Sequence, residues 1–169
     1  RMKSHEYVAI VVGIYRKYLD KAVENLNLPV CKTYATKEDM GKLHQIFNRG
    51  GFSKGYLYGK TGADMICFEK PKNWGVYIGN IISYDKSAKM VKVKLEENLA
   101  IGDGIEIWNK GDGESPGTVV SEIIKNKTNV KEADAGDIVL IGRVNGKIGQ
   151  GNRIYKTSSK KLMEEARAT

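Results

Sequence analysis

The chain has 169 residues, and its 28 Lys and Arg outnumber its 20 Asp and Glu, which gives a formal net charge of +8. Its hydrophobic content of 41% is sufficient for a folded core, which excludes an intrinsically disordered chain. No apolar run reaches the length of a membrane span, no secretory signal is visible, and two cysteines are too few for a disulfide framework or a zinc site. We therefore expect a cytoplasmic protein of one or two small domains.

The positive charge is spread along the chain, with a net charge of +5 in residues 1–70 and +3 in residues 71–169. This distribution favours a polyanionic partner such as RNA, and it fits a merely soluble basic surface equally well. The chain begins at Arg1 without an initiator Met, and only three residues precede a long amphipathic pattern. We therefore expect a fragment of a longer protein.

Two helices are predicted near the N-terminus, the first over residues 4–26 with Ser4 as its N-cap. Its apolar side chains recur at helical spacing, at Tyr7, Ile10, Val11, Ile14, Tyr18, Ala22 and Leu26. This stripe is wider than such a small region can bury, so we expect it to pack on an absent domain, on the rest of the chain or on a second copy. The second helix starts at Thr36 or Lys37, and glycines end it near Gly50.

From residue 74 onward the pattern changes to short strands with alternating apolar residues, separated by turns. Six strands are predicted, at residues 75–82, 89–95, 105–109, 117–124, 137–143 and 148–156. The dipeptide Asn145-Gly146 is a strong hairpin signal, because both residues tolerate positive φ. The fold class is therefore α+β, with N-terminal helices followed by a small six-stranded antiparallel β-barrel. The predicted domains are a helical segment with a Gly-rich loop at 1–70 and the barrel at 71–169.

The loop over residues 50–62 contains five glycines, three aromatic residues and two lysines, which indicates a loop that contacts a partner. Cations hold phosphates, and aromatic rings stack on bases. The candidate binding residues are therefore the alternating cations and aromatic residues of this region, Arg49, Phe52, Lys54, Tyr56, Tyr58 and Lys60. The alternative is that the aromatic residues only pin the loop onto the barrel or the first helix.

No catalytic residue, metal site or cofactor is predicted. The tripeptide Gly59-Lys60-Thr61 lacks the first glycine of a phosphate-binding P-loop at the required distance. His5 and His44 lie on different helices without a partner at the spacing of metal ligands. Asp103 and Asp137 each follow a glycine at a turn, where a carboxylate typically caps its own backbone.

Three blocks of the chain, residues 1–9, 47–57 and 73–79, resemble signature segments of the collagenase-like peptidases grouped as peptidase family U32. The resemblance extends over essentially the whole chain, and His5 stands where the family usually has Pro. It implies a full-length protein in which a large α/β-barrel domain precedes Arg1 and carries the chemistry, with residues 4–26 as its last helix. Family members are labelled proteases, and some relatives are implicated in hydroxylating RNA bases.

The barrel is similar to the second domain of translational GTPases such as elongation factor Tu. The matching features are Gly75, the strand at 90–95 and the Gly-Asp step at 102–103, whereas residues 151–152 read Gly-Asn where Gly-Asp is expected. This resemblance implies a barrel fold but no GTPase activity, because function does not follow from a fold.

These observations favour a non-catalytic C-terminal region of a U32-type peptidase that docks a substrate against the missing catalytic domain. The expected substrate is a collagen-like protein or an RNA, and no cofactor or membrane partner is expected. Two alternatives are an RNA-binding module of an RNA-hydroxylating relative and a peptidase that is active within these residues. A homodimer through the first helix is a further interpretation.

Overall fold

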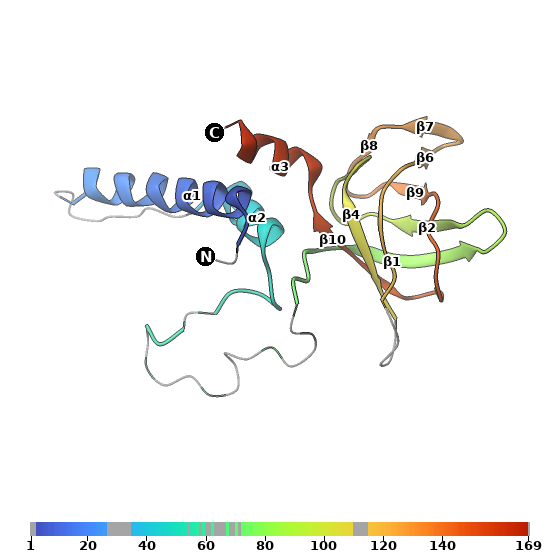
Figure 1. The fold of residues 1–169 in the computed structure, drawn as a ribbon, viewed down its shortest axis with the longest axis horizontal. Coiled ribbons are helices and arrows are strands. Elements are labelled where there is room, and N and C mark those ends of the chain that lie inside the picture. Colours follow the sequence, from blue (N-terminus) through green and yellow to red (C-terminus); the bar gives the residue numbers. More distant parts are fainter. Residues whose placement is uncertain are drawn as a thin grey trace.

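The structure of this chain is a computed structural model that describes residues 3–26, 35–53, 55–57, 59, 62, 67, 70, 72–109 and 115–168. Two helices are followed by a curled antiparallel sheet, and a last helix returns to the first (Figure 1). The helices are α1 (His5–Glu24), α2 (Lys37–Ile46) and α3 (Lys160–Arg167). Within these described residues, no helix combines the length and apolar character needed to cross a membrane.

Each helix begins at a side-chain hydroxyl that accepts a hydrogen bond from the first turn. Ser4 Oγ accepts from the Tyr7 amide at 3.3 Å, and Thr36 Oγ1 accepts from the Asp39 amide at 3.1 Å. The N-caps predicted for the first two helices are therefore confirmed. Ser159 caps α3 in the same way.

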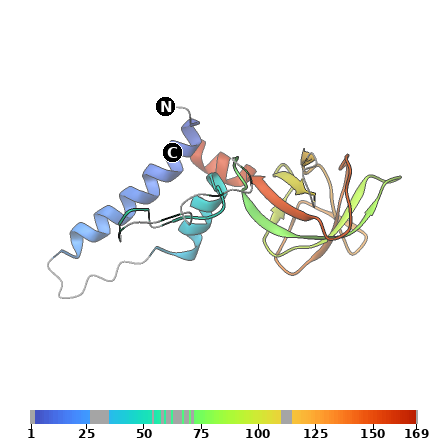
Figure 2. The ribbon, with the colours of Figure 1, turned by 90° about the horizontal axis from the view of Figure 1, so that it is seen from below.

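The described residues form one eight-stranded antiparallel sheet and a separate two-stranded pair. The sheet order is β5-β4-β10-β1-β2-β9-β6-β7, and β3 pairs with β8. The sheet curls around its own core to form a half-barrel (Figures 1 and 2). The strands are β1 (Val76–Asp85), β2 (Met90–Lys94), β3 (Leu99–Ala100), β4 (Gly104–Trp108), β5 (Gly117–Val119), β6 (Ile123–Lys125), β7 (Thr128–Val130), β8 (Glu132–Ala133), β9 (Ile138–Ile141) and β10 (Arg153–Ser158).

The predicted α+β class with an antiparallel sheet is confirmed, but the predicted count of six strands is not. The predicted strand at 117–124 is divided in two, because β5 pairs with β4 whereas β6 pairs with β7 and β9. Three further strands, β3, β7 and β8, were not predicted, and they have only two or three residues each. Such strands are too short to show the alternation from which strands are recognised.

The sheet encloses a continuous apolar core. Of the described residues, fifteen buried apolar side chains form one cluster. On β2, Val91 and Val93 are 0% exposed, whereas Lys92 and Lys94 between and after them face solvent. The alternation predicted for this strand is therefore confirmed, and its two lysines lie on the outer face of the sheet.

The helices share a smaller core that includes the end of the chain. Ile10 and Ile14 of α1 pack with Leu162 and Ala166 of α3, although the whole barrel separates the two helices in sequence (Figures 1 and 2). α3 thus ties the helical segment to the barrel. The domain boundary between residues 70 and 71 stays a prediction.

Candidate functional site

A groove of about 1030 Å³ lies between α2 and the barrel. Its walls come from α2, the Gly50-Gly51 step, the start of β1, the residues after β2, the end of β10 and the start of α3. We call it the α2 groove. The lining residues on which the following argument depends are His44, Gln45, Asn48, Trp74, Tyr77 and Lys156.

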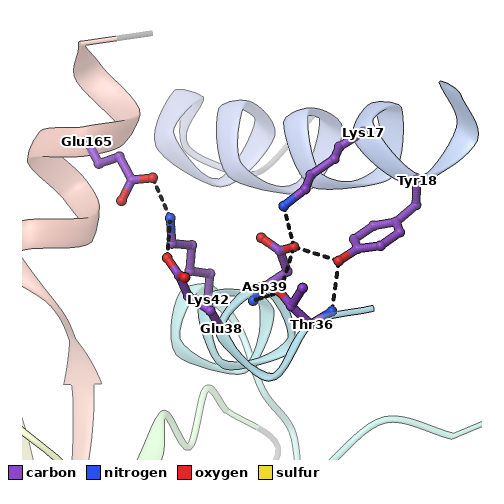
Figure 3. A network of polar contacts seen from close by, with 7 residues as sticks. All are labelled: Lys17, Tyr18, Thr36, Glu38, Asp39, Lys42 and Glu165. Carbon is purple, nitrogen blue, oxygen red and sulfur yellow. Dashed lines mark hydrogen bonds and ion pairs between the residues drawn. The ribbon is translucent and has the colours of Figure 1, made fainter. Parts of the chain in front are cut away.

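A buried carboxylate positions α2 against α1. Asp39 Oδ2 accepts hydrogen bonds from Lys17 Nζ at 2.6 Å, from the Tyr18 hydroxyl at 2.6 Å and from Thr36 Oγ1 at 2.8 Å (Figure 3). The Tyr18 hydroxyl in turn accepts from the Thr36 amide at 2.8 Å. The bond from Lys17, followed by those from Tyr18 and Thr36, holds the pKa of Asp39 well below its ordinary value, and the same bond raises the pKa of Lys17.

A second polar contact joins α2 to α3. Lys42 Nζ lies 2.6 Å from Glu165 Oε1 and 3.5 Å from Glu38 Oε1 (Figure 3). The hydrogen bond to Glu165 is the main reason why the pKa of Lys42 is raised. The wall of the groove that α2 forms is therefore fixed from both sides, by α1 through Asp39 and by α3 through Lys42.

Amide side chains attach the end of α2 to the barrel. Gln45 Nε2 donates to the Lys156 carbonyl at 2.9 Å, and Asn48 Nδ2 donates to the Gly75 carbonyl at 3.0 Å. The Trp74 amide returns a hydrogen bond to the Asn48 carbonyl at 2.7 Å. These bonds link segments that are 27 and 111 residues apart in the sequence, and they set the width of the groove.

Gly75 permits the closest approach of the chain at this junction. Its φ is +69°, and a Cβ atom built there would lie 2.0 Å from the carbonyl oxygen of Lys156. Only glycine combines a left-handed conformation with the absence of that atom. The identity of this residue is therefore a requirement of the groove geometry.

Lys156 places a buried ammonium group in the groove lining. The residue is 6% exposed, and its Nζ donates to the carbonyl and to the Oδ1 of Asn98, at 2.7 Å each. Burial lowers the pKa of Lys156, while the negative charges of Asp103 and Glu97 act in the opposite direction. The ammonium group is therefore held in a fixed position by groups of the protein itself.

Aromatic rings form the barrel side of the groove. The ring centroids of Trp74 and Trp108 are 4.9 Å apart, those of Trp108 and Tyr155 are 4.2 Å apart, and those of Tyr155 and Tyr77 are 5.6 Å apart. Burial, followed by the charge of the nearby Glu96, raises the pKa of Tyr77. The Trp108 indole N–H is buried without a hydrogen-bond partner among the described residues. Trp74, Tyr77 and Tyr155 line the groove and offer flat apolar faces, whereas Trp108 is 7% exposed and packs against Trp74 and Tyr155.

The residues predicted to bind a partner meet the groove only in part. Phe52 stacks on His44 with a centroid distance of 4.3 Å, and His44 lines the groove, so Phe52 lies at its edge. The Arg49 guanidinium lies 5.3 Å from the centroid of the Phe47 ring, and Tyr56 is 74% exposed. The stacking of Phe52 on α2 also agrees with the alternative that the aromatic residues fix the loop. The remaining predicted residues lie outside the described part of the chain, and these are Lys54, Tyr58 and Lys60.

The structure supports the backbone-capping interpretation of the two aspartates. Asp103 Oδ2 accepts from the Ala100 amide at 3.0 Å, and Asp137 Oδ2 accepts from the Asp134 amide at 3.0 Å. Asp103 also accepts from the Lys160 amide, so it anchors the start of α3. In the described part of the chain, no group of three or more His, Cys, Asp or Glu residues could hold a metal ion.

A set of cations on the outer face of the sheet was not predicted from the sequence. Lys92 and Lys94 lie on β2, roughly 7 Å apart along the strand, and Arg153 lies on β10 beside Asn80 of the intervening β1. All three are exposed, and none forms an ion pair with a described carboxylate. We call this set the basic strip. The alternation of valine and lysine at 91–94 is the signal that could have revealed it.

The structure described so far is an antiparallel half-barrel that carries a small helical unit, with a groove between them. Residues 1–66, which include α1, α2 and the Gly50-Gly51 step, match the family model described as peptidase family U32. The resemblance to this family predicted from the sequence is therefore confirmed, and the family model places it in residues 1–66. No match was found among the curated proteins.

Three solved structures are among those similar to this chain. The C-terminal domain of a Geobacillus thermoleovorans protein assigned to the U32 peptidases is 18% identical with a TM-score of 0.44, over 48% of this chain and 91% of that one. The Saccharomyces cerevisiae Ski7 GTPase-like domain is 20% identical with a TM-score of 0.39, over 51% of this chain and 23% of that one. The bacterial selenocysteine-specific elongation factor EF-Sec is 16% identical with a TM-score of 0.36, over 48% of this chain and 14% of that one. A U32 domain and translation-factor domains are thus both represented among the matches.

Proposed function

We propose that this chain is the substrate-docking region of a U32-type, collagenase-like peptidase, and that it holds a polypeptide substrate in the α2 groove without supplying the catalytic groups. The observation that carries the proposal is the composition of the groove. One wall comes from the residues that match the U32 family model, and the other comes from the barrel. A substrate lying there contacts both parts at once.

The charges along the groove favour a polypeptide. Lys37 and Lys161 line it together with Glu38 and Glu97, so both signs of charge are presented. The aromatic wall that ends at Tyr77 offers flat apolar contacts between these charges. Buried aromatic anchors surrounded by a polar rim are typical of protein interfaces.

Two titratable groups of the groove, His44 and Lys156, are engaged by the protein itself, which favours a docking role for them over a catalytic one. His44 is stacked on Phe52, and both acceptors that hold the ammonium of Lys156 belong to Asn98. A general base must reach the proton that it removes. In the proposed arrangement, these groups shape and charge the groove, and the reaction takes place on a partner domain.

The exposed face of α1 is the proposed contact with that catalytic domain. Ile10 and Ile14 face the helical core, and an opposite stripe consists of large apolar side chains that are 50–74% exposed, namely Val8, Val12, Tyr15, Leu19, Val23 and Leu26. Their spacing of three and four residues forms one continuous line over about 27 Å of helix. The catalytic domain is the proposed occupant, because α1 lies wholly within the residues that match the family model.

The occupant of this stripe can be checked from the mass of the purified chain in solution. A monomer agrees with a stripe that serves a different domain. A dimer that Leu19→Glu separates into monomers would show instead that a second copy covers it. The low cysteine content favours the reducing cytoplasm as the compartment in which the assembly works.

Binding of a fluorescently labelled collagen-type peptide tests the proposed groove. Phe52→Ala removes an exposed ring at the groove edge and should weaken binding about fivefold, as the loss of one interface anchor does. Tyr15→Ala is the matched control, because this exposed ring lies on α1 away from the groove. Equal affinities of the two variants would contradict the proposal, and cleavage of the peptide by the isolated chain would overturn its non-catalytic part.

RNA recognition is the second candidate function, and the basic strip is the observation that favours it. Lys92, Lys94 and Arg153 lie on one face without ion-pair partners among the described residues. The positive charge of Arg153 also acts to lower the pKa of Tyr77, which lines the groove. Phosphate contacts of this kind give an affinity that falls steeply with salt concentration. An RNA strand would pass over the strip toward the aromatic wall.

The salt dependence of binding to a single-stranded RNA oligonucleotide separates the two candidates. If the strip binds phosphates, Lys92→Ala and Lys94→Ala should each reduce the slope of log affinity against log salt by about one. Arg16→Ala on α1 removes the same charge elsewhere and serves as the control. Unchanged slopes in both lysine variants would remove the strip as an RNA site.

A further inference from the structure

A second, smaller pocket is lined by residues of the barrel. It involves β6 and β7, which lie on the side of the barrel away from α2 (Figure 1). It encloses about 280 Å³ and is formed by β6, β7, the turn before β4 and the residue that follows Gly142. We call it the barrel pocket. Its lining residues that matter here are Ile101, Glu122, Ile123, Val130 and Arg143. The residues that match the U32 family model do not include it, and the proposed docking in the α2 groove does not involve it.

The barrel pocket combines an apolar surface with two opposite charges. Ile123 is 0% exposed, Val130 is half-buried, and Ile101 is 38% exposed. Arg143 and Glu122 bring a guanidinium and a carboxylate to the same small cavity, and neither forms an ion pair with a described residue. Both charges are therefore available to a ligand.

Backbone geometry positions both charged residues. Arg143 has a φ of +60°, a conformation that glycine adopts freely and that is disfavoured for a residue with a Cβ atom. The chain therefore keeps an arginine at a position where glycine would be easier to accommodate. Gly142 precedes it, and a Cβ atom there would lie 2.7 Å from Glu122 Oε2. The absence of that atom lets the Glu122 carboxylate lie against the backbone next to Arg143.

We propose that the barrel pocket binds a free α-amino acid with an apolar side chain. The guanidinium of Arg143 pairs with the ligand carboxylate, and the carboxylate of Glu122 pairs with the ligand ammonium. Ile101, which is 38% exposed, and the half-buried Val130 contact the side chain. A simple anion would leave Glu122 without a counterion, and the volume lies at the lower end of the range for small-molecule sites, which favours one amino acid over a longer peptide.

Titration of the isotope-labelled chain with L-leucine, followed by NMR, tests this site. We expect saturable shifts in the amides of residues 121–123, 129–130 and 143. N-acetyl-L-leucine lacks the ammonium group and L-leucinamide lacks the carboxylate, so each should bind at least about tenfold more weakly than leucine. Absence of saturable shifts at millimolar leucine would overturn the proposal. Equal binding of N-acetyl-L-leucine would also overturn it, by showing an anion site alone.

A pair of glycine substitutions provides the matched variants. Arg143→Gly removes the guanidinium and suits the positive φ, so the fold is retained. Lys127→Gly does the same at a φ of +65° in the turn between β6 and β7, outside the pocket lining. Leucine affinity should fall at least about tenfold in Arg143→Gly and stay unchanged in Lys127→Gly. Equal affinities in the two variants would refute the site, as would an unchanged affinity in Glu122→Gln.

Discussion

The barrel and the helical segment reach a folded state by different means. The barrel buries fifteen of the described apolar residues in one cluster, whereas α1, α2 and α3 together bury four. The helices are joined largely by ionic contacts, which connect Lys17 to Asp39, Lys42 to Glu165, and Arg167 to Glu6. Apolar burial is the dominant stabilising term in folding, and ion pairs contribute less. The barrel therefore supplies most of its own stability, while the helical segment depends on the contacts of α1 with α3.

The α2 groove lies where these two regions meet, so one wall belongs to the barrel and the other to the helical segment. Its barrel wall is rigid because it is continuous with the core, and its α2 wall is held by hydrogen bonds to Asp39, Lys42 and Gln45. A perturbation of the helical segment should therefore alter the groove before it unfolds the barrel. The following predictions test this difference, beginning with the largest effect.

Truncation of a barrel core residue should have the largest effect. Ile107 is 0% exposed on β4, and Ile107→Ala should lower the free energy of unfolding by about 4 kcal/mol, through lost burial and the cavity left behind. Val119→Ala is the control, because this residue is 61% exposed and its truncation should cost less than about 0.5 kcal/mol. Chemical denaturation measures both values, and similar values would contradict the assignment of the core.

The close approach at Gly75 should produce the next largest effect. Gly75→Ala introduces a Cβ atom 2.0 Å from a carbonyl oxygen and should cost about 3 kcal/mol. Gly136→Ala shares the positive φ, at +95°, but meets open space, and should cost only about 1 kcal/mol. The difference between the two losses of stability measures the steric contribution of the added Cβ atom at Gly75. Equal losses would show that the junction between α2 and the barrel is looser than described.

Loss of the α3 contact should affect the helices and spare the barrel. Leu162 is 6% exposed against α1, and Leu162→Ala should weaken the helical segment by about 2 kcal/mol. Amide hydrogen exchange should accelerate in α1 and stay unchanged in β2 and β9. Lys161→Ala, at the neighbouring exposed position, is the control. Uniform acceleration throughout the chain would contradict the separation of the two regions.

Acidification should loosen the helices through Glu6. The pKa of Glu6 is lowered from 4.5 to about 2, first by its own backbone N–H, then by the side chains of Arg167 and Ser4, with the charge of His5 adding a little. The folded state therefore binds this proton less readily than the unfolded state does. The stability that Glu6 contributes is fully present above pH 4.5 and is lost as the pH falls toward 2.

Helical circular dichroism during an acid titration measures this contribution. Glu6→Gln should be less stable than the parent at neutral pH, and its stability should change less with pH in the same acidic range. The pKa of Asp39 is also lowered, and Asp39 is present in both proteins. It therefore accounts for the pH dependence of stability that remains in Glu6→Gln. Identical acid titrations of the two proteins would show that the contact between Glu6 and Arg167 does not stabilise the folded state.

Several local features of this fold could be predicted from the sequence because their causes are local. The hairpin predicted at Asn145-Gly146 is wrong, because β1 and β2 lie between β9 and β10 in the sheet. Ser4 and Thr36 marked the starts of α1 and α2, and the alternation at 91–94 marked β2 with its buried valines. The turn aspartates Asp103 and Asp137 accept hydrogen bonds from the amides of Ala100 and Asp134, as predicted for turn carboxylates. Each of these signals depends on residues only a few positions apart.

Features that depend on distant residues could not be predicted. Leu162 of α3 packs in one cluster with Ile10 of α1, although the whole barrel lies between them in the sequence. The groove likewise depends on the hydrogen bond from Gln45 to the Lys156 carbonyl. No periodicity connects such positions. The candidate binding residues were chosen for their composition, and the structure brings Phe52 to the groove edge while Tyr56 stays exposed. Composition indicates which groups can bind, and only the tertiary contacts show which of them meet.

Mapping of a bound peptide onto the chain tests the docking proposal most directly. A collagen-type peptide titrated into the isotope-labelled chain should shift the amides of His44, Asn48, Trp74 and Tyr77 on both walls of the α2 groove. The indole N–H of Trp74, which donates to the Lys70 carbonyl, is a separate probe of the same wall. Saturable shifts on both walls are the predicted result. Shifts confined to β2 and its lysines, or no shifts at all, would contradict the account.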